Sequence, residues 1–342
     1  MRDPADSDTL EAFYRASVGM GFAGRKDLDA TARITGGLFG LVVGDALGVP
    51  VQFQPRERVR ADPVEGMDRS FRHHPPGTWS DDSSMALALA DSLAENGWDL
   101  ADQMERFRSW LLHGDYTPHG ESWDIGRTTR DSITRYDRGV PIAETGDRDE
   151  SRNGNGSLMR LLPASIWLAG EEPRVAVERA MRHSEMTHGH IRARLCCAYH
   201  ALLVRELLGG AALRAAMEAA SETLRPSVPE AEREVLAPIL TGEILDRAES
   251  DVESSGYVVH TLEASLWCLD RHDDYRSATL AAVNLGGDAD TTGAVTGGLA
   301  GVTYGMPAVP TPWIQRLESP DRVWTIVRKF ESAARPALEP EA

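Results

Sequence analysis

The sequence predicts an all-α protein, a compact helical bundle with one domain. Apolar residues recur at the three- and four-residue spacing of amphipathic helices along most of the chain, and no long alternating strand pattern appears. Hydrophobic residues make up 42% of the 342 residues and charged residues 26%, which is ordinary for a protein with a true core. The chain is therefore expected to build its core from helices alone.

The predicted helices follow one another with short polar connections. In chain order they span residues 31–48, 82–96, 100–113, 157–169, 173–183, 190–208, 211–223, 229–249, 258–270, 275–284 and 291–304. Two stretches rich in Pro, Gly and charge, residues 55–77 and 139–156, are predicted as long loops, which tend to carry function in compact domains. We place an N-terminal arm at residues 1–29, the folded domain at 30–333 and a flexible tail at 334–342.

Two of these helices carry glycine at every fourth position, although each helical glycine costs roughly 1 kcal/mol relative to alanine. Residues four apart lie on one helix face, so each helix has a bare stripe that lets another backbone approach closely. We predict that the two helices pack tightly in the domain centre, against each other or each against a third helix. The alternative is that a glycine-rich composition produced both series by chance. The glycines are Gly36, Gly40, Gly44 and Gly48, then Gly293, Gly297, Gly301 and Gly305.

Net charge indicates which classes of partner the protein can bind, and the cysteine content indicates the cellular compartment. The formal net charge is −17, which repels nucleic-acid backbones and anionic membranes, so a nucleic-acid partner is unlikely on these grounds. No uncharged run reaches the roughly 18–20 residues of a membrane span, and the N-terminus shows no signal-peptide pattern. The three cysteines have no C-x-x-C spacing and predict reduced thiols without a cysteine metal site. We expect a cytoplasmic protein that binds no membrane.

Two short motifs place paired carboxylates at the start of a predicted helix. The motif "GTWSDDSSMALALADSL" opens with the Ser-Asp-Asp triplet at residues 80–82, in which the serine suits an N-cap and the aspartates suit the helix dipole. The motif "NLGGDADTTGAVTGGLAGVTYG" has the same form, with Asp288, Asp290 and Thr291 before its helix. Helix capping alone explains each motif, and Asp290 is itself an acceptable N-cap.

A metal site is the alternative interpretation if these two helix starts face each other. Four carboxylates in one place repel one another unless a cation neutralises them. A ligand set made only of oxygen selects hard ions such as Mg²⁺, Mn²⁺ or Ca²⁺, and this many carboxylates suits two ions about 3.5–4 Å apart. The glycine-rich stripes would then bring the helices close enough for their carboxylate-bearing ends to share metal.

At these residues the chain resembles the ADP-ribosylglycohydrolase family, from about residue 31 to residue 315. The resemblance implies an all-α fold with two Mg²⁺ or Mn²⁺ ions at the base of a cleft. It also implies hydrolysis of the glycosidic bond between ADP-ribose and an acceptor, often an arginine side chain of a protein. The motifs that carry it are, in order, "GLVVGDALGVPVQF", "GTWSDDSSMALALADSL", "WDIGRTT", "NGNGSLMRLLP", "SEMTH", "SGYVVHTLEASLW" and "NLGGDADTTGAVTGGLAG".

The resemblance also implies roles for individual residues. Asp124 in "WDIGRTT" becomes the carboxylate that orients the scissile bond or activates water, with helix capping as the alternative. Asp82 is implied both as a ligand and as a catalytic group, and Asp45 as a buried capping or supporting group. The metal ligands carried over by motif position are Ser80, Asp81, Asp82, Asp288, Asp290 and Thr291.

The substrate side rests on three further motifs. Backbone N–H groups of Gly154, Gly156 and Ser157, ahead of the helix predicted at 157–169, suit a diphosphate. Arg160 is open to two interpretations, a substrate contact or a structural ion pair. The substrate-binding residues implied by the resemblance are Gln52, Asn155, Gly156, Ser157, Ser184, His188, Gly256 and Tyr257.

One departure from the family pattern concerns Gln52, which stands where family members commonly have Glu. Glutamine keeps an oxygen ligand but cannot act as a base, so either Asp124 takes that role or activity or metal affinity is reduced. Two other functions therefore stay open. The first is a weakly active or inactive ADP-ribose-binding protein of the immunity type that blocks a cognate ADP-ribosyltransferase, and the second is another nucleotide-directed metallohydrolase.

Overall fold

The computed structural model describes residues 28–338, and this part of the chain contains helices and isolated bridges but no β-strand. The predicted all-α class is confirmed. The first half holds α2 (Ala30–Gly48), α3 (Arg56–Ala61), α4 (Asp81–Asn96), α5 (Leu100–His113), α6 (Arg127–Asp137), α7 (Ile142–Thr145), α8 (Leu162–Leu168) and α9 (Pro173–Glu185). The second half holds α10 (Ile191–Leu208), α11 (Leu213–Leu224), α12 (Glu230–Thr241), α13 (Val258–Asp270), α14 (Tyr275–Asn284), α15 (Ala289–Tyr304), α16 (Thr311–Arg316) and α17 (Pro320–Leu338).

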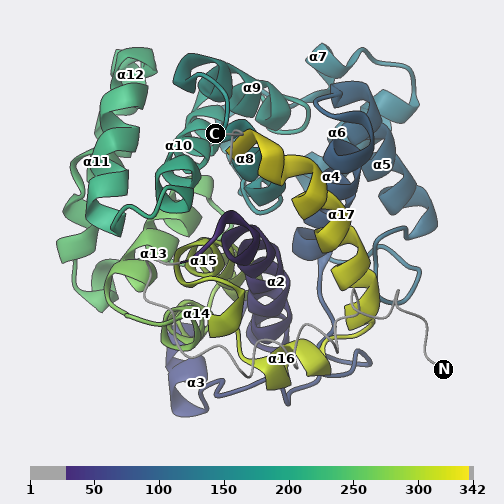
Figure 1. Cartoon of the computed structure of the whole chain (residues 1–342), viewed down its shortest axis with the longest axis vertical. Coiled ribbons are helices and arrows are strands. Elements are labelled where there is room, and N and C mark those ends of the chain that lie inside the picture. The colour runs from purple at the N-terminus through teal and green to yellow at the C-terminus, as the bar shows by residue number, and fades with distance from the viewer. Residues whose placement is uncertain (1–27, 339–342) are drawn as a thin grey trace.

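The two glycine-bearing helices, α2 and α15, lie side by side at the centre of the fold (Figure 1). They run antiparallel, so that Gly40 faces Gly297 and Gly44 faces Gly293. A Cβ atom added at any of these four glycines would lie closer than 3.0 Å to the backbone of the facing helix. Backbones this close leave room for hydrogen atoms only, which is why both helices accept glycine. The prediction of tight central packing is confirmed, with each helix as the partner of the other.

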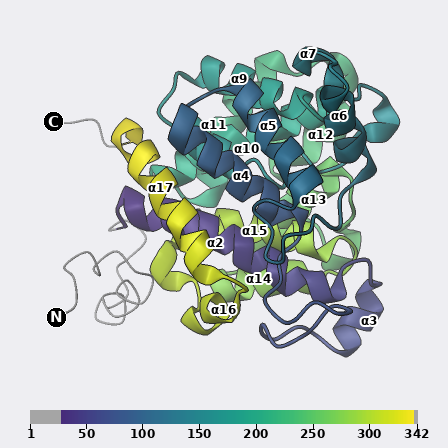
Figure 2. The same ribbon diagram turned by 90° about the vertical axis from the view of Figure 1, so that its right-hand side faces the viewer.

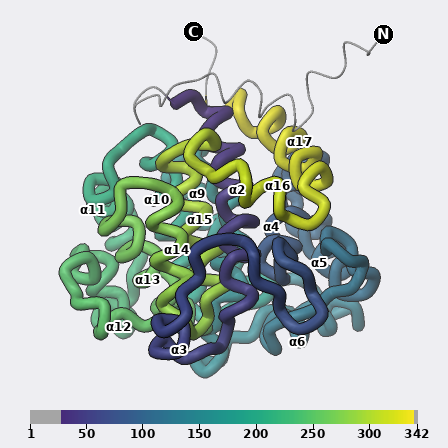
Figure 3. The backbone as a smooth tube through the Cα atoms, turned by 90° about the horizontal axis from the view of Figure 1, so that it is seen from below, coloured from purple at the N-terminus to yellow at the C-terminus, as the bar shows by residue number. Residues whose placement is uncertain are grey.

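The remaining helices surround this central pair. One group, α10 to α14, lies on one side of it, and α4, α5 and α6 lie on the other (Figure 1). Helix α17 crosses the outside of α2 and α4, as the view turned by 90° also shows (Figure 2). Seen from below, the segment that contains α3 spans the front of the molecule (Figure 3). One carboxylate motif therefore starts α15 of the central pair, and the other starts α4, which packs beside that pair.

Helix α2 is unusually apolar for a helix that carries a carboxylate. Of the residues that the structure describes, the only helical segment long and apolar enough to cross a bilayer is Ala30–Val51, and 94% of that window is buried inside the fold. Burial by neighbouring helices accounts for this composition, so the segment is the central core helix.

Several helix boundaries differ from the sequence prediction, for local reasons. The helix expected over 157–169 begins only at Leu162, because Pro163 in its first turn has no N–H to continue an earlier helix. The helix expected over 229–249 ends at Thr241, where Gly242 takes a left-handed conformation with φ of 78°. Short helices also interrupt the two predicted loops, as α3 and α7.

Besides α3 and α7, three longer or later helices were absent from the prediction. Helix α6 is mostly polar, and its apolar signal is confined to Ile133. Helices α16 and α17 follow the last predicted helix, and α17 continues to Leu338 with Ala334 buried. The tail predicted from residue 334 is therefore wrong for residues 334–338. Of the arm predicted at residues 1–29, residues 1–27 lie outside the described part of the chain.

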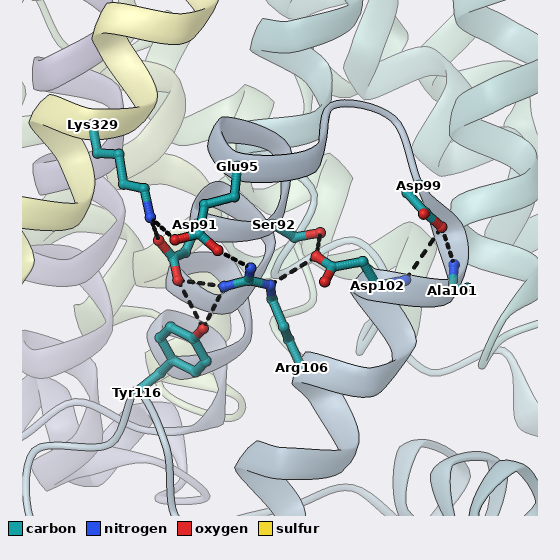
Figure 4. Close-up of polar contacts among 9 residues, drawn as sticks. All are labelled: Asp91, Ser92, Glu95, Asp99, Ala101, Asp102, Arg106, Tyr116 and Lys329. Carbon is teal, nitrogen blue, oxygen red and sulfur yellow. Dashed lines mark hydrogen bonds and ion pairs between the residues drawn. The ribbon is translucent and has the colours of Figure 1, made fainter.

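A charged network ties α4, α5 and α17 together (Figure 4). Arg106 of α5 donates hydrogen bonds to Asp91 and Glu95 of α4, to Asp102 at 2.8 Å and to the Tyr116 hydroxyl at 2.8 Å. Lys329 of α17 donates to the same two α4 carboxylates, at 2.6 Å in the case of Asp91. Only 14% of the Arg106 side chain and 15% of the Asp91 side chain are exposed, so the centre of the network is shielded from water, whereas Glu95 and Lys329 lie at its exposed edge. It anchors the start of the loop between α5 and α6.

Replacing Arg106 by methionine is expected to lower the free energy of unfolding by about 2–4 kcal/mol, because half-buried carboxylates lose their charged donor. The matched control is Arg108→Met on the same helix, whose ion pairs with Glu105 and Asp137 lie at the surface and contribute little. Urea unfolding followed by circular dichroism measures both variants. Equal losses in the two variants would show that the network adds nothing beyond ordinary surface pairs.

Candidate functional site

The structure brings both carboxylate motifs into one cavity of about 250 Å³. The starts of α4 and α15 form its base, and the loops before α6 and α8 form its walls. Its acidic lining comprises Asp81, Asp82, Asp124, Asp288 and Asp290, and its hydroxyl-bearing residues are Thr128, Thr129 and Thr291. The hypothesis that the two helix starts face each other is thereby confirmed.

The start of α4 is held in place by the central helix α2. Asp45 of α2 is fully buried and accepts hydrogen bonds from the backbone N–H of Ser80, at 3.0 Å, and of Ser83, at 3.0 Å. Ser80 is the N-cap, and its hydroxyl accepts from the Asp82 N–H and donates to the Asp82 carboxylate at 3.0 Å. Capping is thus done by Asp45 and Ser80, which leaves the carboxylates of Asp81 and Asp82 free to face the cavity. Ser80 itself does not line it.

The start of α15 presents its carboxylates without using them as caps. Asp288 occupies the N-cap position but makes no side-chain cap hydrogen bond, and Asp290 lies in the first turn. The backbone before it is fixed by Gly287, whose φ of 63° favours glycine, and by a hydrogen bond from the Asp288 N–H to the Ser254 carbonyl at 3.1 Å. The capping explanation for this motif is therefore wrong for both aspartates.

Burial makes the carboxylate cluster electrostatically unfavourable as it stands. Desolvation, and after it the neighbouring carboxylates, hold the pKa of Asp81, of Asp82 and of Asp290 well above the usual range. Desolvation also raises the pKa of Asp124 and of Asp288. One buried oxygen of Asp82 and one of Asp290 have no hydrogen-bond partner. Like charges with unpartnered oxygens are the features that a bound cation would relieve.

The side chains do not form a closed metal cage in this arrangement. Within residues 28–338, no group of three or more His, Cys, Asp or Glu side chains is placed to hold a metal ion. The donor types fit Mg²⁺ or Mn²⁺, because every group at the two helix starts is an oxygen donor. The unpartnered oxygens of Asp82 and Asp290 are the positions at which such an ion would find ligands without displacing a hydrogen bond.

Asp124 enters the cavity from the loop between α5 and α6 in a strained backbone conformation, with φ of 61°. It does not cap α6, whose N-cap residue is Gly126. The preceding Trp123 stacks on His74 with ring centroids 4.5 Å apart and on Phe71 at 6.1 Å. This stack of aromatic rings from two loops fixes the backbone next to Asp124. The alternative of a capping role for Asp124 is wrong, because Gly126 occupies the N-cap position of α6.

Gln52 lies buried beside this acid rather than in the cavity lining. Only 4% of it is exposed, and both its amide nitrogen and its amide oxygen lack hydrogen-bond partners. Contact with Gln52 partly offsets the desolvation that raises the Asp124 pKa. An amide with two free hydrogen-bonding groups is available for a ligand or water in this position.

The predicted substrate loop supplies part of the cavity wall. Asn155, Gly154 and Gly156 line the cavity, and the Asn155 amide donates to Asp288 at 2.6 Å. The N–H groups of Leu158 and Met159 donate to the Asn155 carbonyl, which curls the backbone into a turn. Because the helix starts only at Leu162, the N–H groups of this loop do not lie at a helix N-terminus, and their binding of a diphosphate stays a prediction.

Two predicted residues support this loop from behind. The Ser157 hydroxyl contacts that of Ser184 at 2.8 Å, and Ser184 donates to the His188 carbonyl at 3.0 Å. The His188 ring lines the cavity, and burial lowers its pKa to about 3, so the ring is neutral at physiological pH. Gly256 lines the cavity, whereas Tyr257 packs outside it against His260.

Arg160 is fully buried and makes no ion pair with a described residue. Its guanidinium donates to the Gly156 carbonyl at 2.7 Å and to the Thr187 hydroxyl at 2.8 Å, and it lies over the Phe107 ring at 4.7 Å. Neither interpretation left open by the sequence holds, because Arg160 reaches neither the cavity nor a carboxylate. It joins the substrate loop to the segment that carries His188.

Several lining residues were not predicted. Phe53 directly follows Gln52 in the sequence, and residues 126–129 follow Asp124 closely. Their position next to predicted site residues was the only sequence feature that could have identified them as lining residues. Met159 lies in the substrate loop and had no signal beyond that position.

Known proteins are similar to this chain in sequence and in fold. A family model described as ADP-ribosylglycohydrolase matches residues 26–339. ADP-ribosylarginine hydrolase Tri1 of Pseudomonas putida (strain GB-1) is 35% identical over 289 residues, 84% of this chain and 75% of that protein. ADP-ribosyl-(dinitrogen reductase) glycohydrolase of Rhodospirillum rubrum is 32% identical over 293 residues, 84% of this chain and 90% of that protein. A solved structure described as an "ADP-ribosylglycohydrolase-related protein complex" is 34% identical with a TM-score of 0.73, covering 90% of this chain and 99% of that one.

Proposed function

Because the chain belongs to the ADP-ribosylglycohydrolase family, we propose that it removes ADP-ribose from modified protein side chains, in the first place arginine. The bond hydrolysed is the ribosyl glycosidic bond. The observation that carries the proposal is that one cavity gathers the carboxylates of two helix starts, Asp124 and the loop around Asn155. The names of the two relatives, an ADP-ribosylarginine hydrolase and a dinitrogen reductase glycohydrolase, support a protein substrate.

We also propose two Mg²⁺ or Mn²⁺ ions as cofactors. When bound, such ions would fix ribose hydroxyls and polarise a water. Support comes from the all-oxygen donor set, the raised pKa values and the unpartnered oxygens of Asp82 and Asp290. The ligands in this proposal are Asp81, Asp82, Asp288, Asp290 and Thr291, which line the cavity, and Ser80, which its motif implies although it caps α4 and does not line the cavity.

The side chains around the cavity supply the other catalytic and substrate-binding roles in this proposal. Positive charge develops on the ribose as the glycosidic bond breaks, and a nearby carboxylate stabilises it. Asp124, whose pKa is raised by burial, is placed to accept a proton from the attacking water, a role that the uncharged Gln52 cannot take. Asn155 and the neutral His188 ring offer hydrogen bonds to the sugar and phosphates. Cytoplasmic location is part of the same proposal.

The assay that tests this function is release of ADP-ribose from a protein ADP-ribosylated on arginine, with Mg²⁺, with Mn²⁺ and after chelation. Metal-dependent release of intact ADP-ribose supports the full proposal. Release of ADP-ribose that persists after chelation would contradict the proposed metal cofactors while leaving the hydrolase function supported. Cleavage within the diphosphate instead would favour another nucleotide-directed metallohydrolase.

A second candidate function follows from Gln52, which replaces a potential base beside Asp124. In this alternative the protein binds ADP-ribose with little turnover and blocks a cognate ADP-ribosyltransferase. Residues 1–29 would take part in the block, and residues 1–27 lie outside the described chain. Deleting residues 1–29 separates the two functions, because a hydrolase keeps its activity while a blocking protein loses its partner.

The stabilisation by Mg²⁺ is expected to be larger at pH 7.5 than at pH 5.5. The carboxylates of Asp82 and Asp290 have a raised pKa, so below that pKa each holds a proton that the ion must displace. The gain in Tm on adding Mg²⁺ therefore shrinks as the pH falls. Comparing Tm with and without Mg²⁺ at each pH cancels the titration of the buried histidines. A gain that is equal at both pH values would argue against carboxylate ligands.

A further inference from the structure

Phe53 is an exposed aromatic residue at the edge of the cavity. Its exposed fraction is 70%, the larger of the two values found for exposed large hydrophobic residues in residues 28–338, the other being 49% for Leu112. Phe53 lines the carboxylate cavity, whereas Leu112 lies on α5. A single exposed phenyl ring is ordinary on a protein surface, so what distinguishes Phe53 is its place at the cavity and the backbone that holds it there.

The backbone holds this ring in place at a conformational cost. Phe53 has φ of 59°, in the left-handed region that residues with a side chain avoid. Its N–H donates to the Gly287 carbonyl at 2.5 Å, and the Gly287 N–H donates to the Gln54 carbonyl at 2.8 Å. The preceding residues Val51 and Gln52 are buried. The ring is therefore fixed to the segment that leads into Asp288, and strain of this kind is typical of functional positions.

Phe53 also separates two hollows. On one side is the carboxylate cavity, and on the other is a groove of about 550 Å³ lined by residues 53–57 and by residues 252–255, among others. Phe53 lines both, so a side chain that leaves the cavity toward the groove passes over the ring. The groove carries charges of both signs, at Arg56, Glu57, Arg60 and Glu253, which suits the surface of a protein substrate.

The groups around the ring select the chemistry of that side chain. Five carboxylates and Arg127 line the cavity behind it, and the two divalent cations proposed above would offset most of the negative charge. What distinguishes one acceptor from another here is therefore the aromatic ring, whose face attracts a planar cation and lets it stack. ADP-ribose itself is anionic, so this cation belongs to the acceptor.

We infer that Phe53 determines acceptor specificity, its ring stacking on the guanidinium of the modified arginine and favouring it over acceptors without a planar cation. The inference rests on the proposed hydrolase function. Binding of ADP-ribose is assigned to the other wall of the cavity and does not involve the ring.

The test compares two substrates, a peptide ADP-ribosylated on arginine and one ADP-ribosylated on serine. For Phe53→Leu, the ratio of kcat/KM on the arginine peptide to kcat/KM on the serine peptide is expected to fall about five- to tenfold. Phe53→Trp keeps a stacking surface and should retain the wild-type ratio. Leu112→Ala, the other exposed apolar residue, is the control and should change neither rate.

Two further readouts separate the outcomes. ADP-ribose affinity, measured by calorimetry, should match wild type in Phe53→Leu, which shows that the variant is folded. An unchanged ratio, or an equal loss on both peptides, overturns the role of Phe53 while leaving the hydrolase intact. A wild-type protein that releases ADP-ribose from neither peptide contradicts the proposed function, and one that acts on serine alone overturns the inference about the guanidinium.

Discussion

Replacing Asp290 by asparagine is expected to reduce ADP-ribose release at least about 100-fold while leaving the fold intact. The side chain is buried at the start of α15, and one of its oxygens has no hydrogen-bond partner. Desolvation and repulsion from Asp288, Asp82 and Asp124 raise its pKa well above the usual range. An amide of the same shape removes this repulsion, so the metal-free variant should have a Tm equal to or above that of the wild type.

The combination of lost activity and retained stability is what separates a functional carboxylate from a structural one. Addition of Mg²⁺ should no longer raise the Tm of Asp290→Asn, because an amide binds the ion more weakly than a carboxylate. The matched control is Asp68→Asn, which removes one exposed carboxylate outside the cavity and should change neither activity nor the Mg²⁺ response. Full hydrolysis by Asp290→Asn would falsify the assignment of this site.

Replacing Gly297 by alanine is expected to lower the free energy of unfolding by about 2–4 kcal/mol, despite the better helix propensity of alanine. The added Cβ would lie closer than 3.0 Å to the Gly40 carbonyl oxygen, which is backbone and cannot rotate away. The two central helices must then separate. Because α2 carries Asp45 and α15 carries Asp290, the same separation should also reduce activity.

Gly298→Ala is the control for this prediction. It adds the same methyl group one position along the same helix, but the nearest atom is the flexible end of the Leu162 side chain, at 2.9 Å. Leu162 can move, and alanine gains about 1 kcal/mol of helix propensity, so this variant should stay within about 1 kcal/mol of the wild type. Chemical denaturation of both variants measures the difference. Equal effects at the two positions would show that backbone contact between α2 and α15 does not limit the substitution.

The sequence was sufficient for the features that depend on local spacing. Glycine at every fourth residue identified the helices that approach closely, and the paired aspartates identified both starts that line the cavity. Resemblance to the ADP-ribosylglycohydrolases, carried by ordered motifs, is confirmed by the family model. Helix α17 has a clear apolar face in Val323, Trp324 and Phe330. The sequence therefore contained the signal for this helix, and the prediction overlooked it.

Other features had no signal in the sequence because they depend on distant contacts. Helix α6 is polar, and it is stable because Ser132 is buried and donates to the Thr187 carbonyl at 3.0 Å. Arg160 gave no indication that its guanidinium would be satisfied by a carbonyl and a hydroxyl instead of a carboxylate.

The sequence by itself determined the all-α class, the central helix pair and the acidic composition of the site, because each follows from which residues recur at helical spacing. Only the tertiary structure decided which of these residues face the cavity. Asp45 lies in the last turn of α2 and Asp288 lies just before α15, yet Asp45 caps α4 from another helix and Asp288 lines the cavity. Phe53 lines it too, through a left-handed backbone fixed by a segment more than 200 residues away. Spacing fixes a helix face, whereas the direction of a side chain in a loop depends on contacts between segments that the order of residues does not reveal.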